Sequence, residues 1–127
     1  MFKSYLLDSN ILIGYLNGDE KIVAWIVSQK TDNAFLYISF ITTVEILSLK
    51  TLKDSDIAVI EKFLTAFYDV AATKEILQLA AALRRKGVVT LGDAIVTASA
   101  IIKKCTLVTN DKLLIKKVSK FVEVTSV

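Results

Sequence analysis

Short apolar segments alternate with longer helical patterns along the chain, and this alternation restricts the possible fold more than any other feature of the sequence. Apolar runs bounded by polar residues predict five short strands, at Tyr5–Leu7, Phe35–Ile38, Tyr68–Val70, Thr106–Val108 and Phe121–Val124. A short turn of helix is expected after Asp111, and longer helices are expected at Asn10–Leu16, Glu20–Ser28, Thr43–Leu52, Ser55–Phe67, Lys74–Lys86 and Leu91–Lys103. Strands that alternate with helices predict an α/β fold with a mostly parallel sheet covered by helices on both faces.

The length of the chain and its low content of proline and glycine indicate a single domain that spans residues 1–127. The chain has 127 residues, no proline and only four glycines, so nothing in it marks a linker between domains. Its apolar stretches are shorter than the ~18 residues that a membrane span needs, and an acid interrupts the N-terminal segment too early for a signal peptide. We therefore expect a soluble, cytoplasmic protein.

The content of hydrophobic residues, 54%, is high for a globular protein. This excess predicts a homodimer, formed by the helices around Trp25 and Ile57–Phe67. The net charge of +3 is compatible with a nucleic acid partner without requiring one.

The sequence contains no histidine and one cysteine, Cys105. These counts exclude Ser-His and Cys-His nucleophilic catalysis, histidine-rich zinc sites and clusters of cysteine ligands. Cys105 is predicted to be a small buried hydrophobic residue. Hydrolytic chemistry in this chain must therefore use oxygen ligands.

Four acidic residues stand in or beside the first turns of predicted helices. Asp8 and Asp111 follow predicted strands, whereas Glu45 and Asp93 each come three residues after a threonine. In open parallel sheets, ligands bind outside the carboxyl ends of the strands, where helix N-termini also gather. The four carboxylates are therefore candidates for one site.

Helix capping is the alternative explanation for each acid taken alone. Thr42 with Glu45 matches a capping box, Thr90 with Asp93 resembles one, and the other two acids suit N-cap positions. Caps are normally solvated, however, whereas the segments around Glu45 and Asp93 are apolar enough to be buried on most sides. A shared acidic site explains this burial, and carboxylates without histidine or cysteine favour Mg²⁺ or Mn²⁺.

Four segments, "LLDSNILI", "TTVEIL", "TLGDAIVTASA" and "LVTND", resemble the acidic motifs of the PIN-domain family in order and spacing along nearly the whole chain. Within that family the DSN and TND forms resemble VapC-like toxin ribonucleases of type II toxin-antitoxin pairs. The resemblance implies a three-layer α/β/α sandwich with a central, mostly parallel sheet of about five strands. It also implies a metal-dependent endoribonuclease with Mg²⁺ (or Mn²⁺) as cofactor, RNA as substrate and a cognate antitoxin as partner.

By the same resemblance, the catalytic residues and metal ligands are Asp8, Glu45, Asp93 and Asp111. Supporting residues that orient these carboxylates by hydrogen bonds are then Asn10, Thr109 and Asn110. The chain departs from many relatives at Val96, Ser99 and Leu114, and these departures leave the four acids intact.

Two other functions remain open at this stage. One is a catalytically silent PIN-like module that binds RNA or protein. The other is phosphotransfer with Asp8 as the nucleophile, which expects a second aspartate two residues later, where Asn10 stands. Lysines flank the TND motif, and they either contact RNA phosphates or form a solvated face: Lys103, Lys104, Lys112, Lys116, Lys117 and Lys120.

Overall fold

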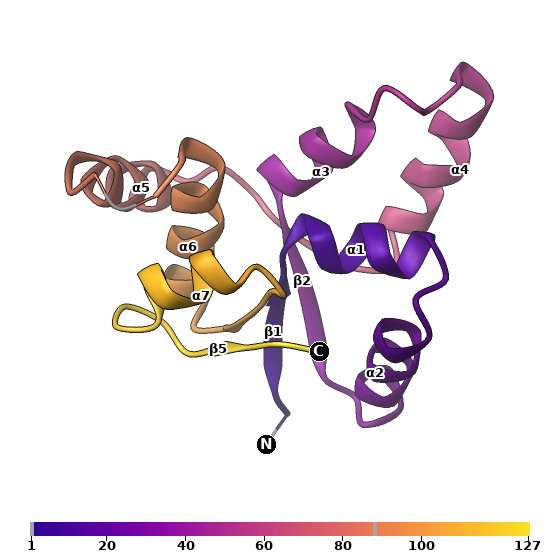
Figure 1. Ribbon diagram of the computed structural model, residues 1–127, viewed down its shortest axis with the longest axis horizontal. Coiled ribbons are helices and arrows are strands. Elements are labelled where there is room, and N and C mark those ends of the chain that lie inside the picture. Colours follow the sequence, from indigo (N-terminus) through magenta and orange to yellow (C-terminus); the bar gives the residue numbers. More distant parts are fainter. Residues whose placement is uncertain (1, 88) are drawn as a thin grey trace.

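A five-stranded parallel sheet runs through the centre of the protein (Figure 1). The structure is a computed structural model that describes residues 2–87 and 89–127. The strands are β1 (Ser4–Leu7), β2 (Phe35–Ser39), β3 (Tyr68–Val70), β4 (Thr106–Val108) and β5 (Val124–Thr125). They stand in the order β3-β2-β1-β4-β5, and each neighbouring pair is parallel. The predicted parallel sheet is confirmed.

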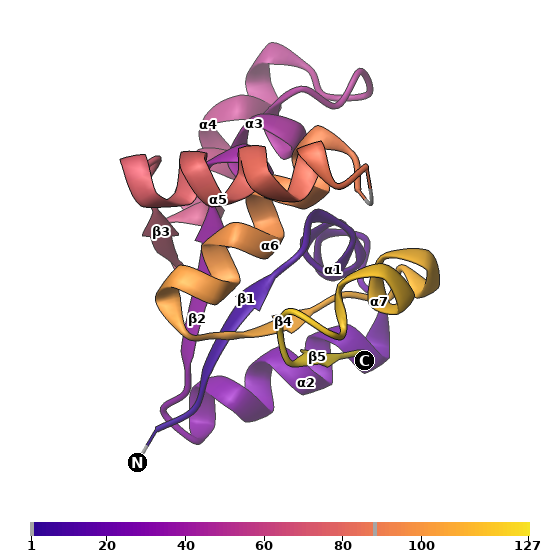
Figure 2. The ribbon, with the colours of Figure 1, turned by 90° about the vertical axis from the view of Figure 1, so that its left-hand side faces the viewer.

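Helices cover both faces of this sheet (Figure 2). They are α1 (Ser9–Leu16), α2 (Glu20–Thr31), α3 (Phe40–Leu47), α4 (Asp54–Leu64), α5 (Lys74–Arg85), α6 (Leu91–Lys103) and α7 (Lys112–Val118). Buried side chains of α5, α6 and α7 pack in one core cluster, and those of α1, α2 and α4 pack in the other. The predicted three-layer α/β/α architecture is therefore confirmed.

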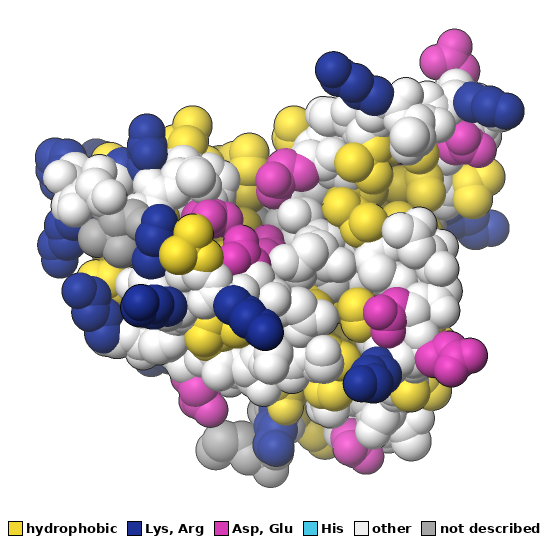
Figure 3. Space-filling view, in the orientation of Figure 1, with side chains coloured by type: hydrophobic (Ala, Val, Ile, Leu, Met, Phe, Trp, Pro, Cys, Tyr) yellow, Lys and Arg dark blue, Asp and Glu magenta, His cyan; other side chains and the backbone are white. Residues whose placement is uncertain are grey.

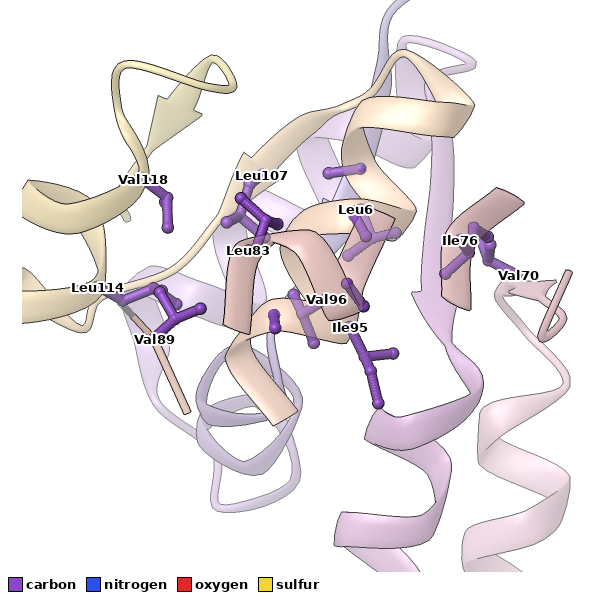
Figure 4. Packing of buried hydrophobic residues seen from close by; sticks show 14 of the residues in the cluster. Leu6, Val70, Ile76, Leu83, Val89, Ile95, Val96, Leu107, Leu114 and Val118 are labelled. Carbon is purple, nitrogen blue, oxygen red and sulfur yellow. The ribbon is translucent and has the colours of Figure 1, made fainter. Parts of the chain in front are cut away.

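The central strands are apolar on both faces because helices cover both. Leu6 and Leu7 are adjacent in β1, both are fully buried, and each belongs to a different core cluster. Figure 4 shows the first cluster, in which Leu6 and Leu107 of the sheet lie near Val96 of α6. Their burial fixes α6 against the sheet and so positions the first turn of that helix.

Several predicted boundaries are wrong, among them the end of the helix predicted at Glu20–Ser28, which continues to Thr31. The strand predicted at Phe121–Val124 is formed only by Val124–Thr125, because Phe121 closes a turn after α7 with a 2.8 Å hydrogen bond from its N–H to the carbonyl of Val118. The helix predicted at Ser55–Phe67 ends at Leu64. Apolar side chains continue beyond both helices, so periodicity alone misplaces these ends.

The third helix also differs from its prediction. It spans Phe40–Leu47 rather than Thr43–Leu52 and is capped by Ser39, whose hydroxyl accepts a hydrogen bond from the N–H of Ile41 (3.4 Å). Glu45 lies beyond the first turn of this helix, not in or beside it as predicted. Thr42 therefore lies inside the helix, where it is fully buried. The predicted capping box between Thr42 and Glu45 is wrong.

No helix in the two described ranges combines the length and the apolar character needed to cross a membrane.

Candidate active site

The register of two central strands brings Asp8 beside Thr109. Leu7 of β1 pairs with Val108 of β4, so the next residue of each strand emerges at the same edge of the sheet. The N–H of Asp8 continues the pairing with a 2.9 Å hydrogen bond to the carbonyl of Val108. Asp8 is then only 7% exposed and caps the N-terminus of α1.

Both carboxylate oxygens of Asp8 accept hydrogen bonds. The N–H of Ser9 donates to Oδ1 (2.9 Å), and the hydroxyl of Thr109 donates to Oδ2 (2.8 Å). The expected contact between Thr109 and a carboxylate is therefore present. These bonds favour the ionised form of the Asp8 carboxyl group, whereas burial disfavours that form.

The direction of the Thr109 hydroxyl is set by its other two partners. Its oxygen accepts hydrogen bonds from Nδ2 of Asn10 (3.3 Å) and from the N–H of Asp111 (3.1 Å). A hydroxyl has one hydrogen and two lone pairs, so its hydrogen remains for Asp8. Thr109 thus requires an acceptor at Oδ2 of Asp8.

The two asparagines differ from their predicted contacts. Asn10 reaches Asp8 only through Thr109. The side-chain oxygen of Asn110 accepts a 2.8 Å hydrogen bond from the N–H of Val127, so this residue anchors the last residue of the chain. The β4–α7 turn directs the side chain of Asn110 toward the C-terminal segment, while its N–H donates to Oδ1 of Asn10 (3.5 Å). The supporting roles of the two asparagines stay predictions.

Asp111 caps α7, and its Oδ1 accepts hydrogen bonds from the N–H groups of Leu113 (3.0 Å) and Leu114 (3.1 Å). The helix-capping alternative therefore describes Asp111 correctly as far as local structure is concerned. Asp8 is likewise an N-cap. Capping and participation in a site are compatible, because a carboxylate oxygen that accepts one hydrogen bond keeps a further lone pair for a cation.

The other two acids come from α3 and α6. Asp93 lies in the first turn of α6, where its N–H donates to the hydroxyl of Thr90 (3.3 Å), as the capping motif predicted. A Cβ atom placed on Gly92 would lie 3.8 Å from Oε2 of Glu45. Glu45 therefore lies against the helical turn that carries Asp93.

The pKa shifts of Asp8 and Glu45 indicate that these two carboxylates feel the charges of other acids in the set. Burial raises the pKa of Asp8, hydrogen bonds from Thr109 and Ser9 lower it, and the charges of Asp93 and Asp111 raise it further. The pKa of Glu45 is raised by burial and then by the charges of Asp8 and Asp93. In Figure 3 acidic side chains gather between α6 and α3 and toward α7. Residues far apart in sequence therefore form one electrostatic cluster.

A family model of the PIN domain matches residues 5–120. The chain belongs to the PIN-domain family. A comparison with curated protein sequences gave no match.

Solved structures share this PIN fold at low sequence identity. A toxin-antitoxin complex from Klebsiella pneumoniae contains a chain that is 24% identical, with 95% of each chain covered and a TM-score of 0.75. A chain of VapBC2 from Rickettsia felis, bound to a promoter DNA fragment, is 21% identical, with 98% of each chain covered and a TM-score of 0.78. A chain of DNA-bound VapBC from Salmonella typhimurium is 19% identical, with 99% of this chain and 98% of the other covered and a TM-score of 0.81.

The donor set of this PIN domain fits a hard divalent cation. All four candidate ligands are carboxylates, which suit Mg²⁺ or Mn²⁺ better than softer metals. Within residues 2–87 and 89–127, no three acidic or cysteine side chains are close enough to hold one ion in the present arrangement. A bound cation would offset the like charges that raise the pKa of Asp8 and Glu45.

Sequence reasoning missed a buried polar contact between α3 and α6. The hydroxyl of Ser99 donates to the carbonyl of Ile95 (2.7 Å) and lies 3.4 Å from the hydroxyl of Ser39.

Thr42 and Thr97 are fully buried, and their hydroxyls have no hydrogen-bond partner in the described part of the chain. Each lies about one helical turn from an acid, Thr42 from Glu45 and Thr97 from Asp93. The four-residue spacing of Asp93 and Thr97 in an otherwise apolar helix was the available signal.

Proposed function

We propose that this PIN domain is a metal-dependent endoribonuclease that hydrolyses RNA phosphodiester bonds. Proteins of the PIN-domain family are nucleases, which assigns the chain to the hydrolases. The observation that carries the proposal is the electrostatic cluster at the carboxyl edge of the sheet. Capping gives no reason for the cluster, because Glu45 lies beyond the first turn of α3 and because the acids meet where their charges oppose one another.

Asp8, Glu45, Asp93 and Asp111 would hold Mg²⁺ or Mn²⁺. When bound, the cation supplies positive charge that lowers the pKa of the attacking water and offsets negative charge on the phosphate. Asp8 is the central ligand in this proposal, because it is the most buried of the four and its carboxylate is fixed by two hydrogen bonds. Asp111 is the most replaceable, because one of its oxygens already caps α7.

Neighbouring groups hold the carboxylate of Asp8 in an orientation in which it can bind the cation. Thr109 holds Oδ2 of Asp8 as an acceptor, and Asn10 holds Thr109. During hydrolysis a water adds to phosphorus and a P–O bond of the RNA backbone breaks. A carboxylate of the cluster takes a proton from the water and passes it on to the leaving sugar oxygen. Asn110 has no direct part, because it binds the C-terminal residue.

We also propose that the protein is the toxin of a toxin-antitoxin pair. Solved structures with this fold include toxin-antitoxin complexes. An apolar surface suited to a partner segment lies on α1, α3 and α4, where Leu16, Val44 and Val59 are 36%, 55% and 66% exposed. Figure 3 shows hydrophobic side chains over α4 and between it and α1. A partner that covers this surface would lie beside the acids without needing to contact them all.

The homodimer remains a prediction. Trp25 is half-buried and packs edge-on against Tyr5, with 5.1 Å between ring centroids, so it contributes to the protein's own core. Val59 of α4 is largely exposed, but the surface proposed for the antitoxin already includes it. Light scattering at micromolar concentration tests the prediction, and a monomeric mass would reject it.

The decisive experiment measures RNA cleavage with Mg²⁺, Mn²⁺ or EDTA for the wild type, Asp93→Asn and Asp54→Asn. Asp54 is a matched control because it also lies in the first turn of a helix, but in α4 and outside the cluster. Thermal melts of each protein with and without Mn²⁺ give a readout independent of cleavage. A cation held at 100 times its Kd raises the free energy of unfolding by about 2.7 kcal/mol.

The proposal expects cleavage by the wild type and Asp54→Asn, loss of cleavage in EDTA, and loss of both cleavage and Mn²⁺ stabilisation in folded Asp93→Asn. A folded wild type that binds RNA but neither cuts it nor gains stability from Mn²⁺ would reject the nuclease. The silent binding module would then be the better description.

A further inference from the structure

A row of lysines runs along α7 away from the candidate active site. Lys112, Lys116 and Lys120 are four residues apart and exposed, whereas Leu114 and Val118 on the opposite side are buried. Lys120 stays in line because Ser119 has helical backbone angles (φ −55°, ψ −28°). Asp111 caps the N-terminus of the same helix. The row therefore begins beside one of the clustered acids, and basic side chains gather over α7 in Figure 3.

Helix stability does not explain this row. A lysine in the last turn interacts favourably with the helix dipole, which is a sufficient reason for Lys116. Lys112, however, lies in the first turn, where a positive charge is unfavourable. Like charges four residues apart also repel, and residues 112–122 include no acidic side chain that would offset them.

The far end of the row meets a lysine from another element. The Nζ atoms of Lys120 and Lys86 lie 5.1 Å and 5.3 Å from the ring centroid of Phe121. Phe121 is half-buried and packs against the core cluster of α5, α6 and α7, which fixes the position of its ring. Two ammonium groups held at one fixed ring form a site with the charge and the donors to bind a phosphate.

We propose that Lys112, Lys116, Lys120 and Lys86 form a track for the backbone of single-stranded RNA, along which the strand runs between the candidate active site and Phe121. The inference rests on the proposed function. Lysines four residues apart repeat every ~6 Å along a helix, so successive phosphates of an extended strand meet successive ammonium groups. A track along one short helix, about 10 Å in α7, suits a flexible single strand better than a rigid duplex.

The test is salt-dependent binding of a fluorescent 12-nucleotide single-stranded RNA in EDTA, which excludes cleavage. The test variant is Lys86→Gln/Lys120→Gln, and the control is Lys21→Gln/Lys50→Gln. The control removes the same charge from exposed positions on α2 and just after α3. Melting curves verify the fold of each variant. For single strands the slope of log K against log salt is about −0.7 per neutralised phosphate, so the test variant, which removes the site for one phosphate, should lose about 0.7 from its slope.

The track also predicts a dependence on RNA length. The test variant should weaken binding of the 12-mer and leave binding of a trinucleotide unchanged, because the shorter RNA does not reach from the acids to Phe121. Equal slopes for the test and control variants would reject the track. Equal weakening of a matched acidic peptide would also reject it, because the surface would then bind anions generally.

Failure of the proposed function is distinguishable from failure of the track. A wild type that never cuts RNA, combined with the expected change of slope, rejects the nuclease and retains the track. A wild type that cuts RNA, combined with unchanged slopes, rejects the track alone.

Discussion

The hydroxyl of Thr109 donates a 2.8 Å hydrogen bond to Oδ2 of Asp8, although the two residues are 101 positions apart in the sequence. The bond depends on the pairing of β1 with β4, which places the two residues side by side. It ties the first acidic motif to the last. It also opposes the effect of burial on the pKa of Asp8.

Replacing Thr109 with valine should raise the pKa of Asp8 further, because the variant keeps the shape of the side chain and loses the donor. The N–H of Asp111 and the amide of Asn10 lose their acceptor as well. We expect a loss of about 2 kcal/mol in the free energy of unfolding, typical of unsatisfied polar groups. Carbon NMR of the Asp8 carboxyl group measures the pKa. Thr109→Ser retains the hydroxyl and should behave like the wild type, and a valine variant with an unchanged Asp8 pKa would contradict this role.

Replacing Asp8 with asparagine should reveal the energetic cost of its charge through pH dependence. The pKa of Asp8 in the folded protein lies above its ordinary value of 3.8. Between these two values the folded protein binds more protons than the unfolded chain, so ionisation of Asp8 lowers stability as pH rises. The free energy of unfolding of Asp8→Asn minus that of the wild type should therefore rise with pH through this interval and then stay level to neutral pH.

The measurement is urea unfolding of both proteins over a pH series. A constant offset is expected in addition, because the asparagine NH₂ group meets a Thr109 hydroxyl that already accepts two hydrogen bonds. Asp54→Asn serves as the control, because Asp54 is not among the charges that raise the pKa of Asp8. A difference that falls with rising pH would contradict the assignment.

The thiol of Cys105 should be almost inert in the folded protein. Burial raises its pKa from 9.0 to about 11, and the residue is only 4% exposed. A shift of this size lowers the thiolate fraction near neutral pH by about 100-fold, and the thiolate is the reactive form. A disulfide reagent should therefore label the native protein at least 100-fold more slowly than the protein in urea. Comparable rates would show that the thiol is accessible.

Replacing Gly14 with alanine should destabilise the contact between α1 and α2. A Cβ atom on Gly14 would collide with Cδ1 of Ile22, which is buried. Alanine gains helix propensity over glycine, but we expect overpacking to dominate and the net loss to be about 1 kcal/mol. Ile22→Val removes the colliding methyl group.

The double variant Gly14→Ala/Ile22→Val should therefore be more stable than the two single changes predict together. Thermal or urea unfolding of the four proteins of this cycle measures the coupling. Strict additivity would indicate that the Ile22 side chain moves aside without cost.

Local sequence signals determined most of the secondary structure. The helix at Leu91–Lys103 has the predicted bounds, because Thr90 caps its start and its apolar pattern continues to its end. The central strands were predicted because runs buried on both faces are apolar without interruption. Three of the acids, Asp8, Asp93 and Asp111, were visible for the same reason, since capping depends on residues next to one another in the sequence. Glu45 was wrongly expected in a first turn, because α3 begins at Phe40.

Tertiary structure decided which of these local features act together. The hydrogen bond between Thr109 and Asp8 requires the register of β1 against β4, and the bond between Asn110 and Val127 requires the C-terminal segment to return past the β4–α7 turn. Thr42 is buried inside α3 because Ser39 caps that helix. Short-range signals carry no information on these contacts, because each depends on chain segments that meet only after the sheet has formed or on a choice between competing caps. The sequence alone therefore determined most helices and strands and the four candidate acids. Only the folded chain decided which groups hydrogen-bond these acids and how the charge of one acid affects the pKa of another.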